Sequence, residues 1–140
     1  MNRTESSRTD VALAILRVVV GIVFLAHGGQ KLFVFGFEGV TGAFTQMGAP
    51  LPQITAPMVA LLEFFGGLAL VAGLLTRFAA VGLALVMLGA MVLVHLAAGF
   101  FAPNGVEFPL TLLAASAALA VAGAGRFSLD HLIAARRAAH

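Results

Sequence analysis

Long apolar segments separated by short polar ones run through almost the whole chain. A helix needs roughly 20 apolar residues to cross the hydrocarbon core of a bilayer. Segments of about this length cover approximately residues 11–34, 55–75, 78–101 and 106–123. We therefore predict an all-α fold in which residues 11–125 form a four-helix transmembrane bundle, with polar tails at residues 1–10 and 126–140.

The first connection between spans has a pattern of its own. Val40, Phe44 and Met47 are spaced i, i+4 and i+7, which places them on one face of a helix. A short helix with one apolar face is typical of a segment that lies in the membrane surface. We therefore predict a short interfacial helix in the first outer loop.

Helix-capping residues mark two further boundaries. Thr9 or Asp10 stands just before the first apolar segment, where its side chain can cap a helix N-terminus. Ser128 stands before residues 129–138 in the same way, and we predict a final short helix there.

Composition agrees with a membrane protein. Hydrophobic residues make up 61% of the chain and charged residues 10%, whereas soluble domains are nearer 45–50% apolar. The net charge is +2, but the basic residues are sparse and flank apolar segments, so nucleic-acid binding is excluded as a function. The chain has no cysteine, which excludes disulfide exchange and cysteine-ligated metal or iron–sulfur sites.

The arginines predict the orientation. They occur before the first span, between the second and third spans at Arg77, and after the fourth span. On the opposite side, Lys31 is the only lysine or arginine in or next to a loop. By the positive-inside rule, both termini of this multi-pass protein are cytoplasmic. Ala26–Gly28 imitates a small-x-small signal cleavage site, but the apolar run is too long for a signal core, so we expect an uncleaved first span.

Ionisable residues inside apolar segments are the candidate functional groups. A charged group in hydrocarbon costs at least a few kcal/mol, so such groups usually face a partner or a cavity. At about 1.5 Å per helical residue, the predicted topology brings one set of them into the outer half of the bundle. This set comprises His27, Lys31, Glu63, His95 and Glu107. Arg17 lies near the cytoplasmic end instead, from where its side chain can snorkel to the interface.

Two interpretations of this set remain open. In the structural one, Glu63 pairs with His27 or Lys31, His95 bonds a backbone carbonyl, and Glu107 stabilises a helix N-terminus. In the functional one, the groups form a ligand or proton site. We favour the second because five ionisable groups converge at one depth.

A lipid-soluble carbonyl compound such as a quinone fits the set best as its ligand. Histidine and lysine can hydrogen-bond its oxygens, Glu63 can carry protons, and Phe and Met side chains can line the ring. A metal is disfavoured because no two of the candidate ligands have i, i+3 or i+4 spacing. Haem between His27 and His95 is a further alternative, since Gly21 and Gly89 precede them by six residues.

The chain also contains a faint internal repeat. A shift of 68 residues aligns five residues of the first span, including His27, with identical residues around His95 in the third. Such a repeat predicts two helical hairpins related by an axis along the membrane normal.

Several motifs resemble the DoxX family. They are HGGQKL at 27–32, EFFGGLALVAGLLTRFAA at 63–80, HLAAGFF at 95–101, NGVEFPL at 104–110 and GAGRFSLD at 123–130. The resemblance covers approximately residues 11–130 and implies a four-span protein of the bacterial inner membrane. Members are often described as oxidoreductases. The family name comes from a subunit linked to archaeal thiosulfate:quinone oxidation, and mycobacterial relatives belong to an oxidative-stress membrane complex.

The resemblance carries over motif positions without assigned roles. They are His27, Gly28, Lys31, Glu63, His95, Glu107, Arg126 and Asp130. Phe108 and Phe127 stand where relatives often have tyrosine, so a phenol hydroxyl is absent, and the missing cysteines argue against direct sulfur chemistry. Arg126 and Asp130 are spaced i, i+4, which predicts an ion pair at a helix end.

Three functions therefore remain open. The first is a membrane component of an oxidoreductase system that handles a quinone or its protons near Glu63. The second is a non-enzymatic scaffold for a partner enzyme in a membrane complex, since the Gly- and Ala-rich helix faces suit a partner or a second copy of the chain. The third is a small transporter or lipid-binding protein.

Overall fold

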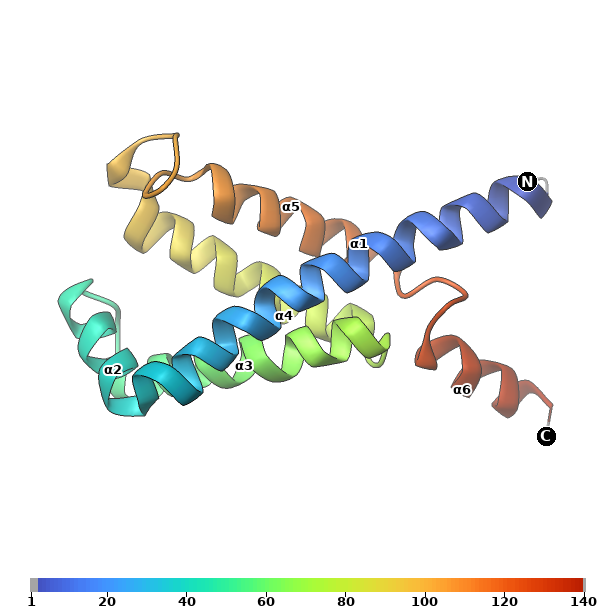
Figure 1. The fold of residues 1–140 in the computed structure, drawn as a ribbon, viewed down its shortest axis with the longest axis horizontal. Helices are drawn as coiled ribbons and strands as arrows, with labels where there is room; N and C mark the ends of the chain where they lie inside the picture. The colour runs from blue at the N-terminus through green and yellow to red at the C-terminus, as the bar shows by residue number, and fades with distance from the viewer. Residues whose placement is uncertain (1–2, 140) are drawn as a thin grey trace.

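The computed structural model describes residues 3–139, and every regular element among them is a helix (Figure 1). The all-α expectation is confirmed for this part of the chain. In chain order the elements are α1 (Arg3–Gly29), the π-helical η1 (Gln30–Phe35), α2 (Gly36–Gln46), α3 (Pro52–Ala72), α4 (Thr76–Ala90), the π-helical η2 (Met91–His95), the 3₁₀-helical η3 (Leu96–Ala98), α5 (Glu107–Ala122) and α6 (Leu129–Ala138).

Three stretches are long and apolar enough to cross a membrane, judged by length and composition. They are Glu5–Gln46, Pro52–Ala72 and Thr76–Ala98. The fourth predicted span corresponds to α5, which is equally apolar but has only 16 residues.

The first helix begins earlier than the sequence predicts. Residues 3–10 belong to α1, while Met1 and Asn2 lie outside the described residues. The prediction that Thr9 or Asp10 caps this helix is wrong, because both lie inside it. The Asp10 carboxylate instead accepts a hydrogen bond from the backbone N–H of Arg126, at 3.0 Å.

The helices pack as two pairs, α1 along α3 and α4 along α5, and α3 also contacts α4 (Figure 1). Glycines set how closely α1 and α3 approach. A Cβ on Gly28 would lie 2.3 Å from the backbone N of Phe64, and one on Gly67 would lie 2.4 Å from the backbone N of Leu25. No other residue fits either position without moving a helix, so small residues allow close backbone packing here.

The apolar core lies between the two helix pairs. Its buried residues are Val20, Phe24, Leu70, Ala79, Ala80, Leu83, Met87, Leu112 and Leu119. Outside it, large apolar side chains point away from the protein, and Phe78 and Val121 are 80% and 81% exposed. Such an apolar exterior suits lipid rather than water.

The structure contains a helix in the first connection between spans, where the sequence predicts one. Gly36, with a φ of +68°, ends η1 and changes the chain direction, and α2 follows. Val40 is buried against the neighbouring helices, Phe44 is half-buried, and Met47 is exposed just past the helix end. The predicted apolar face therefore packs partly against the protein and is partly exposed to the surroundings.

Candidate functional site

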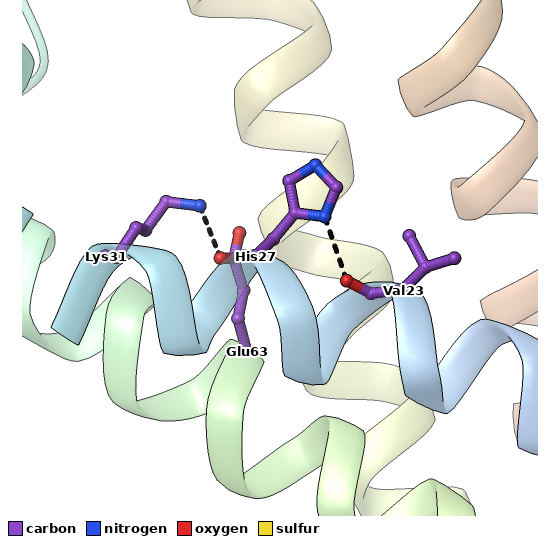
Figure 2. A network of polar contacts seen from close by, with 4 residues as sticks. All are labelled: Val23, His27, Lys31 and Glu63. Atoms are coloured by element: carbon purple, nitrogen blue, oxygen red, sulfur yellow. Dashed lines mark hydrogen bonds and ion pairs between the residues drawn. The ribbon is translucent and has the colours of Figure 1, made fainter. Parts of the chain in front are cut away.

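Lys31 and Glu63 form an ion pair at the end of α1 (Figure 2). Lys31 Nζ lies 2.5 Å from Glu63 Oε2. Glu63 is 3% exposed, and 21% of the Lys31 side chain is exposed. The pair joins two segments 32 residues apart in the sequence. Of the two partners that the sequence offers Glu63, the structure selects Lys31.

Local backbone geometry brings Lys31 to Glu63. Lys31 lies in η1, and a π-helical turn changes the direction in which side chains leave the helix. Gly28 supplies the close approach, since a Cβ there would lie 2.8 Å from the carbonyl carbon of Glu63. The motif HGGQKL thus combines a close helix contact with a cation placed one turn later. Such π-helical turns are frequent at functional sites.

His27 lies one turn before Lys31 and projects from the same side of α1 (Figure 2). Its Nδ1 lies 2.9 Å from the carbonyl oxygen of Val23, and its ring is 5.9 Å from the ring of Phe108 on α5. Because a carbonyl oxygen only accepts, Nδ1 carries the hydrogen, and Nε2 of the neutral ring is left as an acceptor. The imidazole is exposed, so Nε2 is open to a ligand.

Aromatic rings lie beside the ion pair. Phe33 and Phe64 meet edge to face at 5.6 Å, and Phe64 and Phe65 at 5.2 Å. Phe33 is 77% exposed, so one of its faces is open to a second ring.

His95, the last residue of η2, and Glu107, the first residue of α5, both bind the loop between η3 and α5. His95 Nδ1 lies 2.7 Å from the carbonyl oxygen of Asn104, and Glu107 Oε1 accepts from the backbone N–H of Ala102 at 2.5 Å. Both side chains are therefore hydrogen-bonded to the backbone of this loop. The contacts thus match the structural interpretation for His95, and Glu107, the first residue of α5, binds the preceding loop.

The five predicted site residues therefore separate into two groups. Within residues 3–139, no hydrogen bond or ion pair joins His95 or Glu107 to His27, Lys31 or Glu63. The described residues also contain no group of three or more His, Asp or Glu placed to hold a metal ion. The contact between His27 and Phe108 is the link that brings α5 to the first group.

The proposed space for haem beside Gly21 is occupied. A Cβ on Gly21 would lie 2.8 Å from the carbonyl oxygen of Gly67, because α3 packs there. Gly89 has open space next to it. The two glycines therefore have different surroundings, and Gly21 serves helix packing.

Arg17 does not snorkel, contrary to the expectation. It is 2% exposed, and its guanidinium donates to the carbonyl oxygens of Leu70, Val71 and Phe127 at 2.5, 2.9 and 2.7 Å. The last carbonyl oxygens of α3 have no partner within the helix. A cation at a helix C-terminus can donate hydrogen bonds to such oxygens and interacts favourably with the negative end of the helix dipole. Arg17 thus ties α1 to the end of α3 and to the segment before α6.

Asp130 also has a different role from the predicted one. Its Oδ1 accepts from the backbone N–H of Leu75 at 2.7 Å, and its Oδ2 from that of Thr76 at 2.9 Å. The predicted ion pair with Arg126 is wrong because α6 begins only at Leu129, so the two residues do not share a helix. The Asp130 carboxylate caps α4, whose preceding residue Leu75 has a left-handed φ of +49°.

Ser128 behaves as predicted. Its Oγ accepts from the backbone N–H of His131 at 3.2 Å and donates to the carbonyl oxygen of Gly125 at 2.7 Å. Arg77 is exposed at the same end of the molecule and lies over Gly123, where a Cβ would be 3.1 Å from its Nε. We call this end, with Arg17, Arg77, Arg126 and α6, the basic end.

Comparison with known proteins places the chain among membrane proteins. "Putative oxidoreductase CatD" of Bacillus subtilis is 36% identical over 124 residues, which cover 89% of this chain and 88% of the relative. The uncharacterised membrane protein Rv3486 of Mycobacterium tuberculosis is 35% identical over 135 residues, covering 89% of this chain and 82% of the relative. The inner membrane protein YphA of Escherichia coli is 30% identical over 126 residues, covering 86% and 89%.

No solved structure matches the chain significantly. The model of the DoxX family matches residues 12–96, a region that holds α1 from residue 12 onward, α2, α3, α4 and the Lys31–Glu63 pair. Together with the relatives, this match establishes that the chain is a membrane protein of the DoxX family.

Proposed function

We propose that this protein is a quinone-binding membrane component of an oxidoreductase system in the bacterial inner membrane. The observation that carries the proposal is the buried Glu63 carboxylate, which is held by Lys31 one helical turn from the exposed imidazole of His27. A buried ion pair in a membrane segment is costly and marks a candidate site for a ligand or for protons.

The three side chains suit a quinone carbonyl. Lys31 Nζ has three hydrogens, so it can donate one hydrogen bond to a quinone carbonyl oxygen while it keeps its hydrogen bond to Glu63. His27 Nε2 can accept a proton or, when protonated, donate one. The exposed ring of Phe33 offers an edge or a face to the ligand ring.

Reduction of a quinone to a quinol takes up two electrons and two protons. His27 and Glu63 are the groups of this chain that can pass the protons, whereas the electrons come from a partner oxidoreductase, since the sequence contains no redox-active cysteine. The name of the Bacillus relative supports the oxidoreductase assignment.

We also propose four spans, with α5 as the fourth. At 1.5 Å per residue its 16 residues extend about 24 Å, somewhat less than the ~30 Å hydrocarbon core. Its pairing with α4 supports this assignment. The arginines support an inward-facing basic end with both termini cytoplasmic, and α2 then lies at the outer surface.

A scaffold for a partner enzyme is the second candidate. Leu132 and Ile133 on α6 are 56% and 40% exposed, and α6 extends away from the helix pairs (Figure 1). An exposed apolar face on such a helix suits a partner.

One preparation separates the two candidates. The protein is purified from its native membrane in mild detergent, and bound small molecules and proteins are identified by mass spectrometry. A quinone that is retained by the native protein and lost in Glu63→Gln and His27→Ala supports the quinone site. A preparation without quinone but with a stoichiometric protein partner supports the scaffold and contradicts the first proposal.

A further inference from the structure

The basic end contains a hollow of about 670 Å³ that the quinone proposal does not use. Four elements surround it: the start of α1, the start of α4, the end of α5 with the following loop, and the start of α6. Its volume lies within the range of small-molecule sites. Among its lining residues are Arg77, Arg126 and His131, together with Phe78.

Two arginines in the hollow lack an acidic partner. Within residues 3–139, no carboxylate lies within ion-pair distance of Arg77 or Arg126. Both side chains are exposed. A guanidinium presents several hydrogens in a planar fork that matches the oxygens of a phosphate.

The acidic residues that line the hollow are already engaged. The Asp10 carboxylate accepts from the backbone N–H of Arg126, and both Asp130 oxygens accept from the start of α4. Asp130 also lies within electrostatic reach of the buried Arg17 guanidinium. The two carboxylates are therefore partly compensated, while the charges of Arg77 and Arg126 remain available.

The charge distribution of the whole chain points the same way. Seven of the eight basic residues are arginines, and all seven occur in segments that meet at the basic end. Only three of the six acidic residues, Glu5, Asp10 and Asp130, belong to these segments. The difference, seven minus three, is a formal charge of +4 at this end.

An exposed apolar ring adjoins the cations. Phe78 follows Arg77 directly, lines the same hollow and is 80% exposed. A free phosphate makes no use of such a ring, whereas the acyl chain of a phospholipid does. Basic pockets between membrane helices are known to take anionic lipid head groups.

We propose that this hollow binds the phosphate head group of an anionic phospholipid. Arg77 and Arg126 hold the phosphate oxygens, and an acyl chain runs along Phe78. The bound lipid fills the space between α4, α5 and α6, and so joins the α6 segment to the helix pairs.

Native mass spectrometry of the full chain in mild detergent tests the proposal. Phosphatidylglycerol and phosphatidylcholine are titrated into the native protein, Arg126→Gln and the double variant Arg77→Gln/Arg126→Gln. The matched control is Arg136→Gln/Arg137→Gln, which removes the same charge from α6 outside this hollow. We expect preferential binding of phosphatidylglycerol, weakened about fivefold by loss of each hollow arginine and unchanged in the control. Equal binding by all variants, or equal loss in the control, overturns the proposal.

Phe78→Ala distinguishes the source of the phosphate. The side chain is mostly exposed, so this variant keeps the fold, and we expect it to weaken phosphatidylglycerol binding. Inorganic phosphate is titrated separately as a second probe. Binding of inorganic phosphate that depends on Arg77 and Arg126, with lipid binding unaffected by Phe78→Ala, contradicts a lipid ligand.

Discussion

Asp130 caps helix α4 from a position 54 residues further along the chain, with its Oδ2 2.9 Å from the backbone N of Thr76. Its own backbone N–H donates to the carbonyl oxygen of Gly73, at 2.8 Å. The segment before α6 is therefore bonded to the short link between α3 and α4. Through Arg17, the same corner is tied to α1.

Removing this cap should destabilise the protein. Loss of an N-cap carboxylate costs about 1–2 kcal/mol, so we expect Asp130→Ala to lower the free energy of unfolding by that amount. Denaturant titration in mild detergent measures the change. Glu38→Ala is the control, since Glu38 is an exposed acid on α2. An Asp130→Ala protein as stable as the native one would show that the cap contributes nothing.

Arg17 should be among the most sensitive positions. Its three hydrogen bonds to backbone carbonyls are charge-assisted, and such bonds contribute about 1.5–3 kcal/mol each after the exchange with water is counted. We expect Arg17→Met to destabilise the protein by at least about 2 kcal/mol. Arg8→Met, on the exposed part of the same helix, should have little effect. Equal stability of the two variants in the same titration would contradict the role given to Arg17.

Gly28 should not tolerate a methyl group. A Cβ would lie 2.3 Å from the backbone N of Phe64, so Gly28→Ala must push α1 away from α3. We expect a loss of about 1–3 kcal/mol. Gly89→Ala is the matched control, because nothing lies within 4 Å of its Cβ position, and alanine favours a helix by up to about 1 kcal/mol. The reverse order of stability would refute the close packing of α1 and α3.

The Lys31–Glu63 pair should behave as a unit in a double-mutant cycle. Lys31→Met leaves the buried Glu63 carboxylate without its partner, for which we expect a cost of about 3–5 kcal/mol. Lys31→Met/Glu63→Gln removes both charges and should recover most of that loss. Unfolding in detergent gives the coupling energy. Additive effects of the two substitutions would argue against the pair.

Local signals in the sequence predicted local features of this structure. The apolar segments correspond to the observed helices. The cap of α6 by Ser128 could be predicted because a cap and its helix are neighbours in sequence. Lys31 was one of two candidate partners for Glu63. Helix topology restricted the choice to one end of the bundle, but the π-helical turn that selects Lys31 over His27 has no sequence signal of its own.

Contacts between distant segments were not predictable in the same way. Arg17 bonds Leu70 and Phe127, which lie 53 and 110 residues away, and Asp10 bonds Arg126 across 116 residues. These contacts depend on how helix ends meet at the basic end. Unpaired backbone groups there bind the charged side chains, whereas spacing alone suggested an interface for Arg17 and an ion pair for Asp130.

Calorimetric titration with a short-chain benzoquinone tests the proposed quinone site at His27, Lys31 and Glu63 most directly. The native protein should bind one equivalent. Loss of a single charge-assisted hydrogen bond weakens affinity by roughly tenfold or more, so Lys31→Met and Glu63→Gln should both bind much less tightly. His95→Ala, which removes a ring hydrogen-bonded to the loop carbonyl of Asn104, should bind as the native protein does. No binding by the native protein, or equal binding by all four proteins, would contradict a quinone site at these residues.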